Sequence, residues 1–477
     1  MKSYINKSIM ILLVIGIIAC EKRLDEEVFS ELAPSTLFTS EKGISSVLNA
    51  SYAYAHRPGF QDSWSSYHLA SMTTGEIWGQ GGSIENLWLS EIDFTWDGNH
   101  DHIIAQWTIY FNSIRDANIV LDNLDNEVFS DEFKQLTEAE VHFLRGWNYS
   151  ELFNLFGAVP LYKTSTDEPL LPRSTEDEVK GFIEQELITA VADLPVQAPA
   201  YGRASKGAAM AVLCKYYLNT RQWQNAADMA EDIQDLGIYE LLPNFSDVFS
   251  IENEGNQEIL WVLPKDATSP TASQAIDALV FPTDYPWPFP NNIVFAARTY
   301  LYDEFVNSFD ADDVRKNHII TEYVSTTTGE TIQGLGNDQS FPYKIEFDPS
   351  AVGAAAGNDI PAIRYADILL SRAEALNEIS GPTQTAIDLI NEVRTRAGIT
   401  ELSLAGFTKE TLRETILQER GWELFFEGKR REDMIRQEVF ISNAVSRGKN
   451  AQDYHVLFPI PQVELDANPD LVQNPGY

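Results

Sequence analysis

Residues 363–379 read IRYADILLSRAEALNEI, residues 386–399 read AIDLINEVRTRAGI, and residues 411–436 read TLRETILQERGWELFFEGKRREDMIR. In the first two segments, apolar and small side chains recur at helical spacing and mark one face of a helix. These positions are Ala366, Leu369, Ala373 and Leu376 in the first segment, and Ala386, Ile390, Val393 and Ala397 in the second. Alanine at repeated contact positions lets helices approach closely, so the stretch predicts paired antiparallel helices stacked in an array.

The third segment combines carboxylates and guanidinium groups along one predicted helix. Glu419, Glu423 and Glu427 recur every fourth residue. The arginines between and around them are Arg413, Arg420, Arg430, Arg431 and Arg436. Paired carboxylates can act as general acid and base, but a catalytic acid needs an apolar pocket that raises its pKa. Opposite charges three or four residues apart instead neutralise each other, and each exposed pair contributes about 0.2–0.5 kcal/mol. We therefore predict a scaffold helix with surface ion pairs.

Four stretches carry a resemblance to a known family. They are RYADILLSRAEALNE, NEVRTRAG, ERGWELFFEGKRREDMIR and the C-terminal FPIPQVELDANPDLVQNPGY. In this order they resemble the SusD/RagB family, outer-membrane lipoproteins of Bacteroidetes that bind nutrients, usually glycans, for a TonB-dependent transporter. The resemblance implies a mainly α fold, built as a tetratricopeptide-like scaffold of helix pairs. It also implies carbohydrate binding in polysaccharide utilization, with a SusC-like transporter as partner.

The composition of the whole chain predicts a folded and strongly acidic protein. The chain has 477 residues, of which 44% are hydrophobic and 11% aromatic, enough to bury a substantial core. Its formal net charge is −37 and its pI is about 4.4. Such a surface repels nucleic-acid phosphates and anionic lipid, so neither is an expected partner. The same charge favours a neutral polysaccharide over a sulfated or uronic one.

The N-terminus predicts export and lipidation. Lysines precede an apolar segment, residues 9–19, which is shorter than the roughly 20 residues that a membrane-spanning helix needs. This pattern is typical of a signal peptide over residues 1–19. Cys20 then resembles the cysteine that is acylated in a bacterial lipobox; the alternative is an ordinary signal sequence that contains a cysteine. Residues 20–42 would form the lipidated tether, and the acidic residues just after the cysteine, in EKRLDEE (21–27), resemble a signal for the cell surface.

The remaining chain, residues 43–477, is predicted to form a single SusD-like domain. Helical periodicity recurs in about four pairs, near residues 43–125, 131–194, 204–236 and 363–430. One helix pair cannot bury its apolar face alone, so the pairs must stack as a scaffold over residues 43–238 and 363–477. Residues 239–362 lack this periodicity. They predict a loop-rich insertion with short strands, where loops built for function are expected.

Aromatic residues gather in two regions that are rich in glycine or proline. The first is residues 61–99 and the second is residues 283–292. Flat indole and phenol rings can stack on the apolar C–H face of a sugar, while polar side chains bind its hydroxyl rim. Rigid aromatic side chains lose little entropy on binding. The candidate ligand-binding residues are Trp287, Trp78, Tyr285, Trp96, Trp64, Phe289 and Asn292.

The other reading of these aromatic residues is core packing. Trp107, Trp147, Trp223 and Trp422 follow helical periodicity and are assigned to the core. Trp88 stands among the loop candidates with a weaker case for ligand contact. In SusD-like proteins the glycan site lies on loops outside the scaffold, including loops from these two regions. No family motif transfers individual binding residues to this chain.

The sequence contains few signs of metal or catalytic chemistry. His100 and His102 lie in GNHDH, but two histidines at this spacing are a weak metal signal, and we expect a solvated loop. Asp310, Asp312 and Asp313 lack the spacing of a calcium-binding loop, and a structural turn is expected. A structural Ca²⁺ ion elsewhere stays open. The chain has no nucleophile elbow or phosphate-binding loop motif, so we predict neither an enzyme nor a cofactor.

The leading hypothesis is a glycan-binding lipoprotein on the cell surface that passes oligosaccharide or polysaccharide to a TonB-dependent transporter. A RagB-like protein that binds peptides for a similar transporter is the first alternative, and it would have a polar cleft with fewer aromatic rings. A surface glycoside hydrolase is the second, and it needs two carboxylates about 5–9.5 Å apart across a cleft. A purely structural array is the third, and it would bury the loop aromatics.

Overall fold

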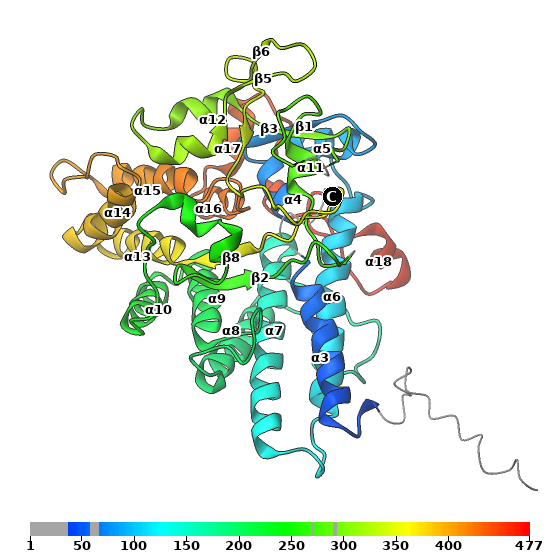
Figure 1. The fold of residues 1–477 in the computed structure, drawn as a ribbon. Helices are drawn as coiled ribbons and strands as arrows, with labels where there is room; N and C mark the ends of the chain where they lie inside the picture. The colour runs from blue at the N-terminus through cyan, green and yellow to red at the C-terminus, as the bar shows by residue number, and fades with distance from the viewer. Residues whose placement is uncertain (1–36, 58–65, 270, 290–292) are drawn as a thin grey trace, which may run out of the picture.

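The computed structural model describes residues 37–57, 66–269, 271–289 and 293–477, and its helices pack one on the next as a continuous array (Figure 1). The N-terminal half of this array consists of α3 (Glu41–Ala55), α6 (Asp101–Asp122), α7 (Asp131–Phe156) and α8 (Glu176–Asp193). It continues through α9 (Lys206–Asn219), α10 (Trp223–Asp235), α13 (Tyr365–Ser380), α14 (Gln384–Arg396) and α15 (Lys409–Glu423). The predicted scaffold of helix pairs is confirmed.

Local sequence explains where these helices begin and how closely they pack. Thr175 begins α8 with a capping box, in which its side chain and that of Glu178 satisfy each other's backbone N–H groups. Ala208 on α9 and Ala226 on α10 are buried where the two helices meet, and Cys214 is a free, buried thiol beside them. Small side chains at these positions allow the close approach that the alanine pattern predicts.

Residues 239–362 depart from the helical array as expected. Within the described residues, the short strands form two-stranded antiparallel sheets. The pairs are β1 (Ile77–Gln80) with β3 (Arg298–Leu301), β2 (Ile259–Leu263) with β8 (Ile360–Arg364), β4 (Ile319–Ile320) with β7 (Phe341–Pro342), and β5 (Glu322–Val324) with β6 (Thr331–Gln333). The β2–β8 pair joins the two ends of the insertion, so the chain returns to the scaffold directly at α13.

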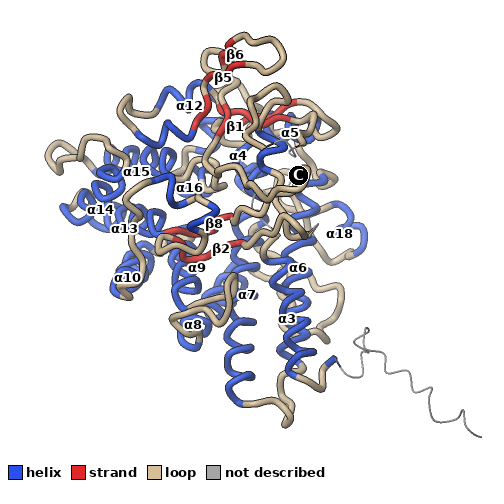
Figure 2. The backbone as a smooth tube through the Cα atoms, viewed as in Figure 1, coloured by secondary structure: helices blue, strands red, loops and turns tan. Residues whose placement is uncertain are grey.

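Shorter helices complete the described part of the fold. They are α4 (Ser66–Met72), α5 (Glu85–Asp93), α11 (Ile276–Val280), α12 (Asp303–Ser308), α16 (Arg430–Arg436), α17 (Phe440–Ser446) and α18 (Gln462–Ala467). The 3₁₀ helices are Phe245–Val248, Ile251–Asn253, Val314–His318 and Asp453–Val456. Figure 2 shows the strands β1, β5 and β6 among loops at the top of the view, beyond the helical array. Among the described helices, none is long and apolar enough to cross a membrane.

The charged segment differs from the prediction of one helix with surface ion pairs. The helix α15 ends at Glu423, and Phe426 (φ 57°) and Gly428 (φ 72°) turn the chain before α16. Glu419, Glu423 and Arg420 are fully buried. The sequence could not indicate this burial, because the neutralising partners come from other parts of the chain.

Long-range arginines hold these carboxylates in the interior. Arg364 Nη1 lies 2.5 Å from Glu423 Oε1, and Arg364 Nε lies 2.8 Å from Glu427 Oε2. Arg315 Nη1 lies 2.8 Å from Glu419 Oε1. Burial alone would raise the pKa of Glu423, but the surrounding guanidinium groups, led by that of Arg396, hold it well below its ordinary value. These ion-paired carboxylates are structural, in agreement with the predicted scaffold role and not with that of a general acid.

The aspartate run after residue 309 also has a structural role. Asp313 caps the 3₁₀ helix Val314–His318 by accepting a hydrogen bond from the backbone N–H of Arg315. The Asp313 carboxylate also pairs with the Arg315 guanidinium at 2.7 Å, and both side chains are buried. The expected turn is therefore an ion-paired helix start.

Candidate functional site

The strands β1 and β3 bring aromatic rings from distant parts of the chain together. Antiparallel pairing sets Trp78 opposite Tyr300, and their ring centroids lie 5.3 Å apart. The Tyr302 ring lies 6.3 Å from that of Trp78. Trp78 and Tyr302 are half-buried, whereas Tyr300 is buried beneath them. The Trp78 indole Nε1 donates a hydrogen bond to the Asp338 carbonyl at 2.6 Å, which holds the ring in one orientation.

The proline-rich segment after Val280 supplies a second set of rings. Trp287 is half-buried and lies 5.1 Å from Phe347 and 5.4 Å from the buried Phe281, measured between ring centroids. Its Nε1 donates to the Pro282 carbonyl at 3.2 Å. Tyr285 is also half-buried, and its ring lies 5.5 Å from that of Tyr323. Buried phenylalanines therefore anchor this loop and leave parts of both rings accessible.

Polar side chains connect the two sets of rings. The Tyr323 hydroxyl donates to Asp284 Oδ1 at 2.9 Å, and Tyr323 also lies within electrostatic range of Tyr300 and Arg298. A hydrogen bond from Ser325, aided by that from Tyr323, lowers the pKa of Asp284, so this carboxylate is an ionised acceptor at neutral pH. Arg298, which opposes Gln80 across the β1–β3 pair, is a half-buried donor.

We call this surface the aromatic band. Its members are Trp78, Tyr300, Tyr302, Tyr323, Tyr285 and Trp287, with Asp284, Arg298 and Gln80 as its polar groups. It lies outside the helical array, at the end where β1, β3 and β5 gather (Figure 1). The band combines fixed rings with hydrogen-bond donors and acceptors beside them, the two features that an apolar sugar face and its hydroxyl rim require.

Not every predicted residue lies in this band. Trp64 and Asn292 fall outside the described residues. Phe289 is half-buried and packs against the core. Trp96 lacks the exposed ring that the sequence predicted: its side chain is only 4% exposed, and its centroid lies 4.9 Å from that of Phe94. Trp96 is buried because the chain turns inward after α5, where Phe94 adopts a left-handed conformation (φ 56°).

The remaining tryptophans also divide between core and periphery. Trp107 and Trp147 are buried, as predicted, whereas Trp223 and Trp422 are half-buried on the scaffold. Trp88 is fully buried on α5. The residues 61–99 are less loop-like than their glycine content indicates, since α4, β1 and α5 lie within them.

Sequence reasoning missed Tyr300, Tyr302, Tyr323 and Arg298. The run RTYLY (298–302) does place Arg298, Tyr300 and Tyr302 at alternate positions, which is the spacing of side chains on one face of a strand. Its partner strand β1 lies more than two hundred residues earlier in the chain. The sequence alone therefore does not reveal that Tyr300 and Trp78 share one surface.

Two clefts lie apart from the aromatic band. One, of about 580 Å³, is lined by Tyr54, Arg57, Tyr201 and Lys265 among others. The other, of about 420 Å³, lies beside α6 and is lined in part by Phe111, Arg115, Tyr162 and Asp167.

Comparison with known proteins assigns the chain to a family. A family model described as SusD family matches residues 321–477, and one described as "Starch-binding associating with outer membrane" matches residues 22–218. A SusD-like protein of Formosa agariphila is 29% identical, covering 99% of both chains. The starch-binding protein SusD of Bacteroides thetaiotaomicron is 26% identical over 76% of each chain.

Solved structures share the fold at lower identity. A laminarin-binding SusD-like protein is 23% identical with a TM-score of 0.79, covering 91% of this chain and 99% of that one. Surface glycan-binding protein A from Bacteroides thetaiotaomicron, in complex with laminarihexaose, is 20% identical with a TM-score of 0.77 and the same coverage. The two family models match the two ends of the chain, and the Formosa agariphila relative matches it over nearly its full length. The shared fold agrees with this assignment. The protein belongs to the SusD/RagB family.

Proposed function

We propose that this protein captures oligosaccharide or polysaccharide on the aromatic band and delivers it to a partner TonB-dependent transporter in the outer membrane. The observation that carries this proposal is the half-buried state of Trp78, Tyr302, Tyr285 and Trp287, whose rings are held by buried neighbours but keep accessible parts. Rings that are fixed before binding lose little entropy when a sugar stacks on them.

Each polar group of the band has a role in this proposal. The ionised Asp284 accepts hydrogen bonds from sugar hydroxyls, and Arg298 donates to their oxygens. Gln80, across from Arg298, can do either. The indole N–H groups of Trp78 and Trp287 already donate to backbone carbonyls, so both residues contribute apolar ring surface.

A neutral glycan is the proposed substrate class. The net charge of −37 opposes the approach of a sulfated or uronic polymer. Two structural neighbours are described as binding laminarin or laminarihexaose, and laminarihexaose is uncharged. The SusD relative is described as starch-binding and two structural neighbours as laminarin- or glycan-binding, and we propose that this chain too binds glycan and is not an enzyme.

The cellular arrangement rests on the N-terminus. We propose that residues 1–19 are removed, that Cys20 carries the lipid, and that residues 20–42 tether a single domain, residues 43–477, to the outer surface of the membrane. A SusC-like transporter would then take the glycan from the band. The family model described as associating with the outer membrane begins at residue 22, just after this cysteine.

The alternatives make different demands on the band. A hydrolase needs a general acid with a raised pKa, whereas Asp284, the carboxylate at the centre of the band, has a lowered one. A peptide carrier would bind through backbone hydrogen bonds and depend less on the rings. Peptide binding is therefore an arm of the experiment.

The test is affinity electrophoresis of the protein in gels containing neutral or anionic polysaccharides, with casein-derived peptides tested by calorimetry. We expect a neutral glycan to retard the protein without release of reducing sugar. Trp287→Ala should abolish or greatly weaken this retardation. Tyr201→Ala is the matched control, because Tyr201 is an aromatic residue 57% exposed outside the band.

Three outcomes would contradict the proposal. They are wild-type glycan binding by a folded Trp287→Ala protein, loss of binding in Tyr201→Ala, and peptide binding without any glycan binding. Release of reducing sugar would support the hydrolase instead.

A further inference from the structure

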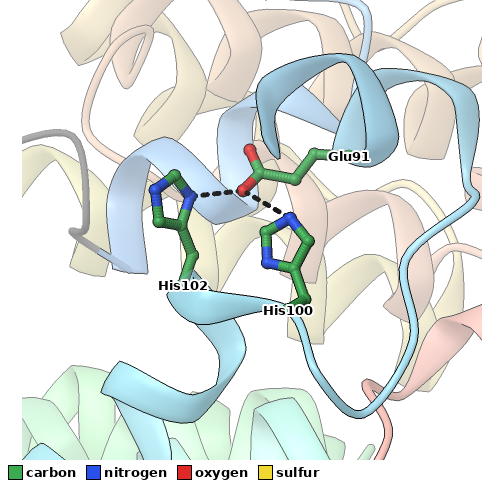
Figure 3. Close-up of side chains that lie close together, drawn as sticks. All are labelled: Glu91, His100 and His102. Carbon is green, nitrogen blue, oxygen red and sulfur yellow. Dashed lines mark hydrogen bonds and ion pairs between the residues drawn. The ribbon is translucent and has the colours of Figure 1, made fainter. Parts of the chain in front are cut away.

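Glu91, His100 and His102 converge in the interior, where the sequence predicted a solvated loop for the two histidines. Figure 3 shows both imidazole rings facing the same carboxylate oxygen. His102 Nδ1 lies 2.5 Å from Glu91 Oε1, and His100 Nε2 lies 3.6 Å from it. One potential ligand atom from each residue lies within 4.8 Å of the other two. Glu91 and His102 are fully buried, and His100 is 5% exposed.

Two helices hold these side chains in place. Glu91 lies in the last turn of α5, whereas His100 is the N-cap of α6 and His102 lies in its first turn. His100 has an extended backbone and His102 a helical one, so two residues separated by one position present their rings to the same point. The turn at Phe94 brings α5 back against the start of α6. The cluster is therefore built on regular elements and not on a surface loop.

The charge balance around Glu91 differs from that of the buried carboxylates in the scaffold. Several of those are neutralised by arginine or lysine, as Glu423 is by Arg364 and Asp367 by Lys215. Within the described part of the chain, the ion pairs of Glu91 involve histidines alone. Its second oxygen, Oε2, is buried and has no hydrogen-bond partner among the described residues. A buried carboxylate oxygen without a partner is costly, so this site favours a bound cation.

We propose that Glu91, His100 and His102 bind a divalent transition-metal ion, with Zn²⁺ as the best match. Two imidazole nitrogens and one carboxylate oxygen are zinc ligands, and three protein ligands leave a fourth position for water. Calcium and magnesium prefer oxygen ligands alone. This assignment does not depend on glycan binding.

Both separations from the Glu91 oxygen are close to what zinc requires, and the two histidine nitrogens lie within 4.8 Å of each other. Ligand atoms about 2.0–2.1 Å from a tetrahedral ion lie about 3.3 Å from each other. The separation of His100 Nε2 from Glu91 Oε1 is near this value already, and that of His102 Nδ1 must open by less than about 1 Å. His100 Nε2 also lies 3.2 Å from the Leu87 carbonyl, and binding to the metal replaces that hydrogen bond.

A metal at this point would stabilise the layer behind the aromatic band. It would join α5 to α6, and α5 packs on β1, the strand that carries Trp78. The Trp88 ring on α5 lies directly against Gly79, where an added Cβ would come within 2.3 Å of it. Fixing α5 therefore fixes the backbone next to Trp78.

The experiment is a zinc titration of the full protein, purified without a histidine tag and first dialysed against chelator. We expect calorimetry and elemental analysis to give one bound zinc per chain, with calcium and magnesium much weaker. Zinc should raise Tm, since a ligand that binds only the folded state stabilises it. Co²⁺ in place of zinc should give the visible absorption of a four- or five-coordinate ion.

Matched variants locate the site. Glu91→Gln keeps the shape of the side chain, and we expect at least about 100-fold weaker zinc binding, since even partners of metal ligands are worth 10–100-fold. We expect His100→Gln to weaken zinc binding in the same way. This variant tests the location of the site if Glu91→Gln does not fold. His142→Gln is the control, because His142 contacts Glu186 at 2.9 Å and Glu138 at 3.9 Å but lies outside the cluster. It should bind zinc as wild type does.

The proposal is overturned if the wild-type protein takes up no zinc at micromolar concentration, which would leave a buried histidine–carboxylate pair only. It is also overturned if folded Glu91→Gln and His100→Gln bind zinc normally, or if His142→Gln loses the ion equally. Trp78→Ala should keep its zinc, so failure of glycan binding and failure of the metal site can be told apart.

Discussion

The indole Nε1 of Trp96 donates a hydrogen bond of 2.8 Å to the hydroxyl of Tyr477, the last residue of the chain. That hydroxyl in turn donates to the Leu457 carbonyl at 2.7 Å. Asn474 adds hydrogen bonds from its side-chain amide to the carbonyls of Phe156 and Phe458. The C-terminal QNPGY therefore closes the core over an N-terminal tryptophan and the end of α7.

Tyr477→Phe tests this closure. The change leaves the buried indole N–H of Trp96 without its acceptor, and an unsatisfied buried donor costs about 1–3 kcal/mol. Urea unfolding should show a lower free energy of unfolding by about that amount. Tyr454→Phe is the control, since its hydroxyl has no hydrogen bond in the part of the chain described. Equal stability of the Tyr477→Phe and wild-type proteins would show that the contact adds nothing.

Arg364→Met tests the buried charge network. Arg364 contacts Glu258, Glu423 and Glu427, so its loss leaves three buried carboxylates with less compensation. Removing one partner of a buried ion pair lowers the free energy of unfolding by about 3–5 kcal/mol. Arg221→Met removes an exposed ion pair with Glu438, and a loss of at most about 1 kcal/mol is expected there. Chemical unfolding measures the free energy of unfolding of both variants. If Arg364→Met and Arg221→Met lose the same amount of stability, the buried position of the Arg364 network is contradicted.

Glu76→Gln tests a pH dependence of stability. Burial raises the pKa of Glu76 from 4.5 to about 7, although its carboxylate accepts a hydrogen bond from the Phe426 backbone. The folded protein therefore keeps a proton that the unfolded chain releases. The stability from protonated Glu76 is complete below about pH 4.5 and is lost as the pH rises through 7.

Glu76→Gln cannot titrate, so we expect it to lose less stability than wild type between pH 5 and 8, by about 1–3 kcal/mol. Urea unfolding at several pH values gives the slope of the free energy of unfolding against pH. Glu127→Gln alters an exposed carboxyl and should leave the slope unchanged. A slope in Glu76→Gln that equals that of wild type would assign the pH dependence to other groups.

Trp78→Phe separates ring stacking from orientation of the ring. Phenylalanine keeps an apolar ring but loses the hydrogen bond to the Asp338 carbonyl. Trp78→Ala loses both, and truncating a central binding residue typically costs 2 kcal/mol or more, which is roughly a 30-fold loss of affinity. We expect Trp78→Phe to lie between wild type and Trp78→Ala in calorimetry with the glycan. If Trp78→Phe binds as poorly as Trp78→Ala, the orientation of the ring decides affinity.

The helical scaffold can be predicted from the sequence alone. Ala386, Ile390, Val393 and Ala397 recur at helical spacing, and all four are fully buried, the first three on α14 and Ala397 at its C-cap. Helix formation depends on hydrogen bonds between residues four apart and on an apolar face that follows the helical period. Residues close together in the sequence are therefore sufficient to predict a helix. The C-terminal QNPGY is likewise recognisable in the sequence as part of the resemblance to the SusD/RagB family.

Tertiary structure decided which charged side chains and which aromatic residues outside the scaffold helices are buried. Trp96 is covered by Tyr477, Glu423 is neutralised by Arg364, and His102 meets Glu91 across the junction of two helices. Each pair joins residues from different elements, and no local period encodes which of them will meet. Burial of a charge or a ring depends on the partner that the folded chain brings to it, because desolvation is compensated only by direct contact.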